Sequence, residues 1–116
     1  MSSSLTVAKH RTNLQRLREE TEAGILTLQA SYNELDPEEA ASDVGAGEDE
    51  GGSEGDLTRF ERDRIRARIA EEKLFLEVID AAEARTHERN WKNCTKCGNP
   101  IGDDRLDALP ATELCV

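Results

Sequence analysis

Three cysteines near the end of the chain have the spacing of metal ligands. Cys94 and Cys97 are separated by two residues, and Cys115 follows after a spacer of seventeen. Two intervening residues let both thiolates of one tight turn face a single tetrahedral ion, and a further cysteine at this distance fits a zinc ribbon. Gly98 suits such a turn, because the residue after the second thiolate often needs a positive φ. The sequence therefore predicts a zinc site.

The zinc-ribbon pattern places its fourth cysteine two positions beyond Val116, so we expect three ligands from this chain. Truncation of a longer natural sequence would explain this. Alternatively, the fourth donor is water, a residue of another chain or His87, although a histidine near a helix C-terminus also suits the surface. A redox pair and a buried structural cysteine are the other interpretations of Cys94 and Cys97, but the sequence lacks the βαβ pattern of thioredoxin-like redox sites.

Two long helices are expected to carry this site. Apolar residues recur at helical spacing over residues 5–35 and again over 58–89, where Thr58 and Glu61 form a capping box. A first helix of about 31 residues would be roughly 46 Å long, so it needs a partner helix. The expected contact faces are Val7, Leu14, Leu17, Ile25, Leu28, Tyr32 and Leu35, and then Phe60, Ile65, Ile69, Leu76 and Ile79, with Leu74, Phe75 and Val78 widening the second face toward a small core.

The net charge of −10 comes from the segment between these helices. Ten acidic residues and no lysine or arginine lie between Glu34 and Asp56, whereas the rest of the chain has fifteen acids and fifteen bases. Because no uniformly basic face remains, we do not expect sequence-specific DNA binding. Glycine and acid dominate residues 40–55, which predicts a flexible acidic tip.

Composition restricts the remaining classes of protein. A chain of 116 residues with 36% hydrophobic and 3% aromatic residues cannot fill a large core, so a metal site and a coiled coil are needed to stabilise it. Because no apolar run reaches about 18 residues and no signal peptide is recognisable, we expect a cytoplasmic protein with reduced thiols. No nucleophile elbow, phosphate loop or paired histidine supports an enzyme.

The cysteine segment also resembles a known family, the C-terminal zinc finger of the DksA/TraR bacterial transcription regulators. The resemblance covers about the last quarter of the chain and, more weakly, Phe60-Glu61-Arg62. It implies a helical hairpin on a zinc-bearing base, which in the best-studied members enters the secondary channel of RNA polymerase with an acidic tip. The matching residues are Cys94, Cys97, Gly98, Ile101, Arg105, Leu106, Ala108, Pro110, Leu114, Cys115 and Val116.

Two acidic clusters are candidates for that tip. Tips that act on polymerase often carry Asp-x-x-Asp-x-Ala, and the stretch from Asp36 to Ala41 resembles it with Glu39 in place of the second aspartate. Glu54 and Asp56 form the second candidate, and the sequence does not choose between them. Clustered carboxylates attract hard cations, so either cluster could perturb Mg2+ coordination at a polymerase active site.

We therefore expect a mainly α fold, with a long antiparallel two-helix coiled-coil hairpin and a small C-terminal zinc-ribbon-like finger. The hairpin would span residues 1–89, with its tip at about 36–57, and the finger residues 90–116. The expected function is a DksA/TraR-like regulator that binds RNA polymerase. The alternative is a zinc-finger stress or adaptor protein that binds another protein. The oligomeric state stays open, because an exposed hairpin could pair with itself.

Overall fold

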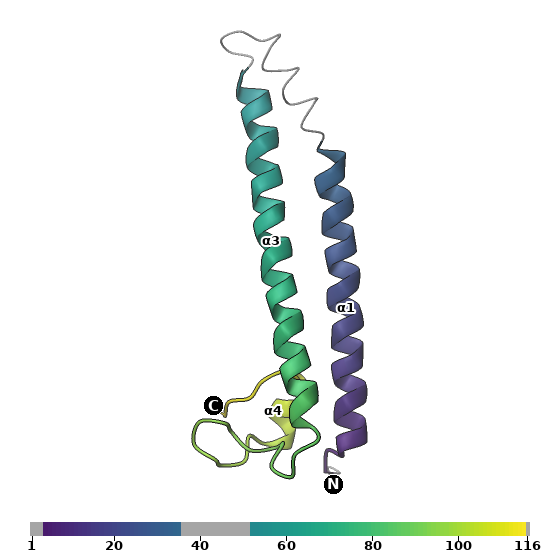
Figure 1. Cartoon of the computed structure of the whole chain (residues 1–116), viewed down its shortest axis with the longest axis vertical. Helices are drawn as coiled ribbons and strands as arrows, with labels where there is room; N and C mark the ends of the chain where they lie inside the picture. Colours follow the sequence, from purple (N-terminus) through teal and green to yellow (C-terminus); the bar gives the residue numbers. More distant parts are fainter. Residues whose placement is uncertain (1–3, 36–51, 116) are drawn as a thin grey trace. The chain divides into compact units, whose positions relative to one another are not determined.

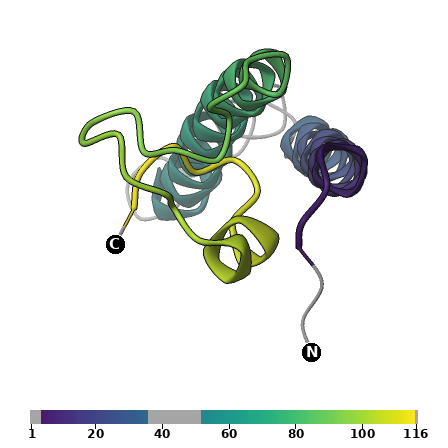
Figure 2. The ribbon, with the colours of Figure 1, turned by 90° about the horizontal axis from the view of Figure 1, so that it is seen from below.

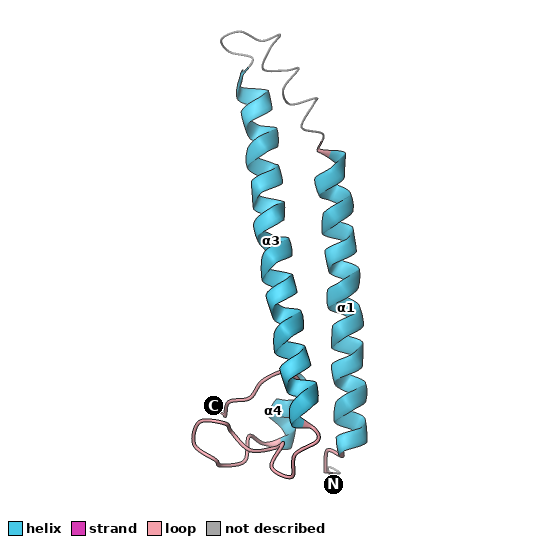
Figure 3. Ribbon diagram, in the orientation of Figure 1, coloured by secondary structure: helices cyan, strands magenta, loops and turns pink. Residues whose placement is uncertain are grey.

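The fold was examined in a computed structural model, which describes residues 4–35 and 52–115. These residues form α1 (Val7–Glu34), α3 (Gly52–Arg85) and the short α4 (Asp103–Ala108) (Figure 1, Figure 3). No strand occurs in this part of the chain, and one isolated antiparallel bridge joins Asn93 to Pro100. None of its helices is both long and apolar enough to cross a membrane.

The chain divides into two compact units, and each contains a stretch of both long helices. Unit 1 comprises Met1–Glu22 and Leu74–Val116, and unit 2 comprises Ala23–Lys73. Within unit 1, Arg11 bonds to Thr86 while Arg18 pairs with Asp80, so the helices run antiparallel there. The prediction of a mainly helical fold with two long helices packed together is confirmed.

Two apolar clusters form the core of unit 1. The first lies between the long helices and the chain that follows α4, and the second joins the start of the chain to the cysteine turn and α4. Figure 2 shows α4 and the loops around it at the ends of the two long helices. Each fully buried leucine or isoleucine stabilises the unit by about 1.5–3 kcal/mol. The clusters consist of Leu14, Ile79, Ala82 and Ala111 with Leu17 and Leu76, and of Leu5, Cys94, Ile101 and Leu106 with Trp91 and Cys115.

The start of α3 differs from the prediction. The capping box placed it at Thr58, whereas α3 already begins at Gly52 and Thr58 lies inside it. Thr-x-x-Glu stabilises a helix start only where the preceding backbone leaves N–H groups unpaired. Because the helix continues upstream, backbone carbonyls accept those bonds. At the other end α3 stops at Arg85, four residues before the expected position 89.

The expected widening of the apolar face of α3 is also wrong. Leu74 and Val78 are 61% and 46% exposed, and Phe60, predicted to face α1, is 64% exposed. A pair of helices covers only the narrow stripe where they touch, which on α3 includes Leu76 and Ile79. Side chains that flank this stripe are covered less, although Phe75 and Val78 line a cavity together with residues 108–112.

Candidate metal centre

The three cysteines converge within unit 1. Their sulfur atoms all lie within 4.8 Å of one another, and the Sγ atoms of Cys97 and Cys115 are 3.6 Å apart. Tetrahedral zinc with Zn–S bonds of about 2.3 Å would hold neighbouring thiolates about 3.8 Å apart. The cluster therefore has nearly the dimensions of a zinc site.

A tight turn presents Cys94 and Cys97. The Cys94 amide donates to the Asn99 carbonyl at 2.7 Å, and the Gly98 amide donates to the Cys94 carbonyl at 2.9 Å. Gly98 has a φ of 81°, a left-handed conformation that side chains disfavour. The expected role of this glycine is confirmed, and the turn brings both sulfurs to one side.

Hydrogen bonds to its neighbours hold the segment that carries Cys115. The Thr95 amide donates to the Glu113 carbonyl at 2.9 Å, and Arg105 Nε donates to the Leu114 carbonyl at 2.9 Å. Residues 103–105 open α4. Asp103 there accepts from the Leu5 amide at 2.9 Å and pairs with Lys92 at 3.1 Å. Arg105 of the short α4 thus bonds to the residue that precedes Cys115 and fixes the backbone there.

The local electrostatics prepare Cys94 for a metal. Its side chain is buried, and the backbone N–H groups of Cys115, Cys97 and Lys96 lower its pKa from 9.0 to about 6. Hydrogen bonds with Cys97 and Cys94 instead raise the pKa of Cys115. Because a thiolate is the form that binds metal, Cys94 is ready at neutral pH while Cys115 must still lose a proton.

These residues suit zinc and leave one donor unassigned. Soft thiolates in a cluster of this size select zinc over hard cations such as Mg2+. Among the described residues no histidine, aspartate or glutamate joins the three cysteines. His87 is exposed, with Nδ1 3.3 Å from Nη2 of Arg11, which agrees with a surface position. The chain therefore offers three zinc ligands.

Unit 1 also contains a buried histidine, which was not among the predicted site residues. His10 stacks on Trp91 with ring centroids 4.8 Å apart, and its Nδ1 has no hydrogen-bond partner. Burial, followed by the positive charges of Arg85 and Lys92, lowers the pKa of His10. Only the fold brings Trp91 against it, because the two residues lie far apart in the chain.

The candidate tip residues are not tested by the structure. Asp36 and Glu39 lie outside the described residues. Glu54 and Asp56 belong to the first turns of α3, rather than to the expected loop, and their side chains are not described. Both acidic clusters stay predictions.

Comparison with known families supports the assignment of the finger. Residues 82–116 match the family model of the prokaryotic dksA/traR C4-type zinc finger. The matched segment contains all three cysteines and most of the second core cluster of unit 1. No curated protein and no solved structure matches the chain. The resemblance read from the cysteine segment is thus confirmed for that segment, and a zinc cofactor follows from its family and its thiols.

Proposed function

We propose that this protein is a DksA/TraR-type regulator that binds RNA polymerase through the secondary channel. The match of residues 82–116 to the dksA/traR zinc finger supports a role in transcription regulation. The observation that carries the proposal further is the combination of that three-thiol finger with two long antiparallel helices in one small chain. A pair of long helices packed against each other is a form that can enter a channel.

In this proposal the acidic residues between the helices act on the polymerase. Asp36 with Glu39, or Glu54 with Asp56, would approach the metal-centred active site. Carboxylates attract hard cations and basic channel walls, so they can alter Mg2+ coordination without reading DNA bases. The protein would then change transcription while catalysing no reaction itself. Such a partner would place it in the cytoplasm.

Zinc would have a structural task. Cys94 belongs to the same apolar cluster as Leu5, Ile101 and Leu106, so a metal held by Cys94, Cys97 and Cys115 would fix the finger to the start of α1. Structural zinc sites contribute directly to folding free energy. The thiols therefore support the base of the hairpin and need not touch the polymerase.

Photocrosslinking tests the partner and identifies the tip. A photoreactive amino acid at Glu39, at Asp56 or, as a control within unit 1, at Glu19 would be incorporated into the full zinc-loaded chain and mixed with bacterial RNA polymerase. We expect crosslinks inside the secondary channel from at least one of the two acidic positions. A second factor that binds the same channel should compete and prevent them. Glu19 should give no crosslink inside the channel. Absence of any crosslink from a folded, zinc-loaded protein would reject the proposal.

An adaptor function is the second candidate, and Glu39 is the observation that favours it. Glutamate at this position moves the carboxylate by about one methylene, and transition-state geometry tolerates little displacement. If the chain acts through this cluster, Glu39→Asp should strengthen its effect in a transcription assay with purified polymerase. If Glu39→Asp has no effect and no crosslink forms, the zinc finger serves to bind a different protein.

A further inference from the structure

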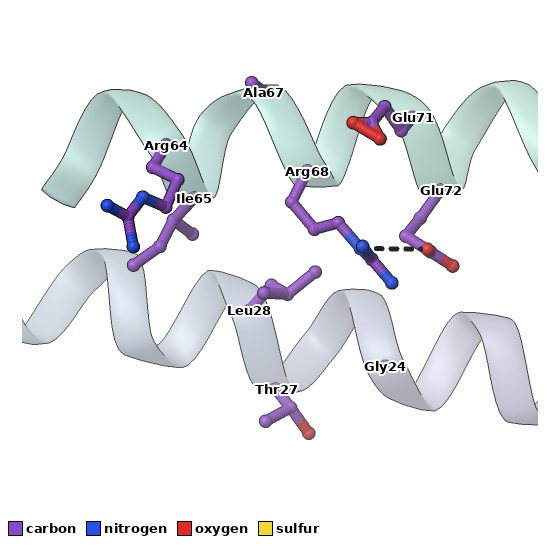
Figure 4. Close-up of a pocket in the computed structure, with 9 residues that line it drawn as sticks. All are labelled: Gly24, Thr27, Leu28, Arg64, Ile65, Ala67, Arg68, Glu71 and Glu72. Carbon is purple, nitrogen blue, oxygen red and sulfur yellow. Dashed lines mark ion pairs between the residues drawn. The ribbon is translucent and has the colours of Figure 1, made fainter. Parts of the chain in front are cut away.

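The cations of α3 in unit 2 lie on two flanks of the helix. Helical geometry, at about 100° per residue, places one set of them within an arc of about 60°. This set, the basic stripe, consists of Arg59, Arg62, Arg66 and Lys73. Arg64 and Arg68 fall on the other flank, where they line a groove of about 750 Å³ between the helices (Figure 4). The two flanks differ in how their charge is balanced.

The groove flank is neutralised within α3. Arg64 pairs with Glu61 at 3.6 Å, and Arg68 pairs with Glu72 at 3.2 Å, the ion pair drawn as a dashed line in Figure 4. Each guanidinium therefore has a carboxylate of its own helix, and an anion from outside would have to displace that carboxylate. This flank offers a matched control for the other.

The basic stripe is not neutralised in this way. Arg66 donates to the Tyr32 hydroxyl at 2.8 Å, and neither Arg66 nor Lys73 has an ion pair within the described part of the chain. Asp63 acts on Arg66 electrostatically without forming an ion pair. Of the α1 residues in unit 2, Glu34 alone is acidic, and it lies two positions from Tyr32 and so on another face. Two exposed cations are therefore left without a carboxylate partner.

The spacing of the stripe is that of a coiled coil. Arg59, Arg66 and Lys73 recur at every seventh residue, the repeat at which flanking charges of one helix pair with those of a neighbouring helix. From its first to its last residue the stripe is about 21 Å long. The exposed Ala70 lies between Arg66 and Lys73 and, because it is small, lets another backbone come close. The stripe thus has the geometry to meet carboxylates of a further helix.

A nucleic acid fits this flank less well than a helix does. Proteins that bind single strands stack bases on exposed aromatic rings, but the Arg62 guanidinium covers the Tyr32 ring, 3.8 Å from its centroid. Phe60 is exposed but lies on the flank of Arg64, whose guanidinium is 5.7 Å from the centroid of that ring. The net charge of −10 also opposes a continuous phosphate backbone more than a helix with a few carboxylates.

We propose that the basic stripe binds an acidic α-helix of another protein, which packs beside α3 as a third helix. Carboxylates at heptad spacing on that helix pair with Arg66 and Lys73, while Arg59 and Arg62 add positive charge. Such binding does not depend on the proposed function, since it uses the side of the helix pair rather than its acidic residues. Charge pairing of this kind contributes to specificity and to the rate of association more than to affinity.

Fluorescence anisotropy on the full zinc-loaded chain tests the class of partner. The probe is a fluorescein-labelled, alanine-based helical peptide with glutamate at every seventh position, and its control is the same peptide with glutamine there. At about 0.1 M salt, which screens charges more than about 10 Å apart, we expect a dissociation constant of about 10–500 μM for the glutamate peptide. The glutamine peptide should bind at least about tenfold more weakly. Equal binding of the two peptides, or binding of neither, would overturn the proposal.

Paired substitutions in α3 test the face. Arg66→Gln with Lys73→Gln should weaken binding of the glutamate peptide at least about fivefold. Arg64→Gln with Arg68→Gln removes the same charge from the same helix and should change the dissociation constant less than about twofold, because those side chains are already paired. An equal loss in the two double variants would indicate non-specific attraction and would reject the stripe as the site.

A conservative variant separates charge from local structure. Arg66→Lys with Lys73→Arg keeps both charges and should bind the glutamate peptide within about twofold of wild type. Circular dichroism should show the same helix content for this variant, for Arg66→Gln with Lys73→Gln and for wild type. If the conservative variant lost binding, the hydrogen bond between Arg66 and Tyr32 would matter rather than the charge, and the proposal would be rejected.

Two further results would assign the stripe to another occupant and overturn the proposal. A single-stranded uridine oligonucleotide that binds more tightly than the glutamate peptide, and that Arg66→Gln with Lys73→Gln releases, would identify a nucleic acid. Peptide binding that appears only after the acids of residues 36–50 are changed to their amides would mean that the chain's own acidic segment occupies the stripe. We expect the glutamate peptide to bind with those acids in place and more tightly than the oligonucleotide.

Discussion

At the scale of single residues, the affinity of the metal centre depends on how tightly its thiols hold protons. Cys94 has a pKa of about 6, whereas the pKa of Cys115 lies above 9.0. Zinc must therefore displace the Cys115 proton at neutral pH. We expect the apparent zinc affinity to rise at least about tenfold per pH unit between about pH 6.5 and 8. Competition with a chromophoric chelator measures this, and an affinity independent of pH would exclude Cys115 as a ligand.

His10 should make the stability of unit 1 depend on pH. Its pKa is lowered in the folded state, so the unfolded chain binds a proton more readily. The free energy of unfolding contributed by His10 is therefore complete above about pH 6.5 and is lost as the pH falls toward the lower folded pKa. Comparing urea denaturation of wild type and His10→Phe isolates this term, since phenylalanine can keep the stack on Trp91.

Two controls separate this effect from protonation of the thiols. The comparison is made on metal-free protein, where zinc release cannot contribute. His87→Phe, a matched change at an exposed position, should leave the pH dependence intact. If wild type and His10→Phe lose stability in parallel from pH 7 to pH 5, the buried histidine does not titrate as inferred.

At the scale of elements, α3 supplies the cap that α1 lacks. The last turn of α1 contains no basic residue, although cations there stabilise unpaired carbonyls. Arg62 of α3 fills this role, because Nη1 donates to the Tyr32 carbonyl at 3.0 Å and also to that of Leu35. Its guanidinium also lies 3.8 Å from the centroid of the Tyr32 ring, while Arg66 donates to the Tyr32 hydroxyl at 2.8 Å.

Arg62→Gln should therefore loosen the end of α1. We expect a loss of about 1 kcal/mol in unit 2 and faster amide hydrogen exchange near Tyr32. Arg62→Lys keeps the charge but cannot form the same fork, so it should be intermediate. Lys73→Gln removes a charge from an exposed position of α3 and serves as the control. Equal exchange near Tyr32 in all four proteins would show that the cap contributes nothing.

The sequence predicts these elements better than it predicts what covers them. Helical periodicity through Leu14 and Ile79 predicted the helix pair, and the Cys-x-x-Cys-Gly pattern predicted the turn, because both are local signals. Periodicity could not show that Leu74 and Val78 stay exposed, since that depends on whether a third element lies against α3. It equally could not place His10 against Trp91, which are far apart in the chain. The fold class and the clustering of the three cysteines were predictable, and tertiary coverage was not.

At the scale of the whole molecule, the unequal burial of the two units has a consequence for unfolding. Unit 1 contains the fully buried Leu14, Ile79 and Leu106 together with the zinc ligands, whereas Ile25 is the buried hydrophobic residue among those described in unit 2. We expect unit 2 to unfold first on heating. Circular dichroism should then record an early loss of helix before the fluorescence of Trp91, the single tryptophan, changes in unit 1.

Matched substitutions and metal removal would assign the two transitions. Ile25→Ala should lower the midpoint temperature of the early transition, and Leu14→Ala that of the late one. The leucine substitution should cost about 2–5 kcal/mol in the free energy of unfolding of unit 1. Removing zinc should lower only the late transition, since the thiols belong to unit 1 and bound metal stabilises the unit that holds it. The experiment is run at one low protein concentration, so that self-association cannot shift either transition. Coincident transitions by both probes, shifted together by both substitutions, would mean that the long helices couple the units into one cooperative structure.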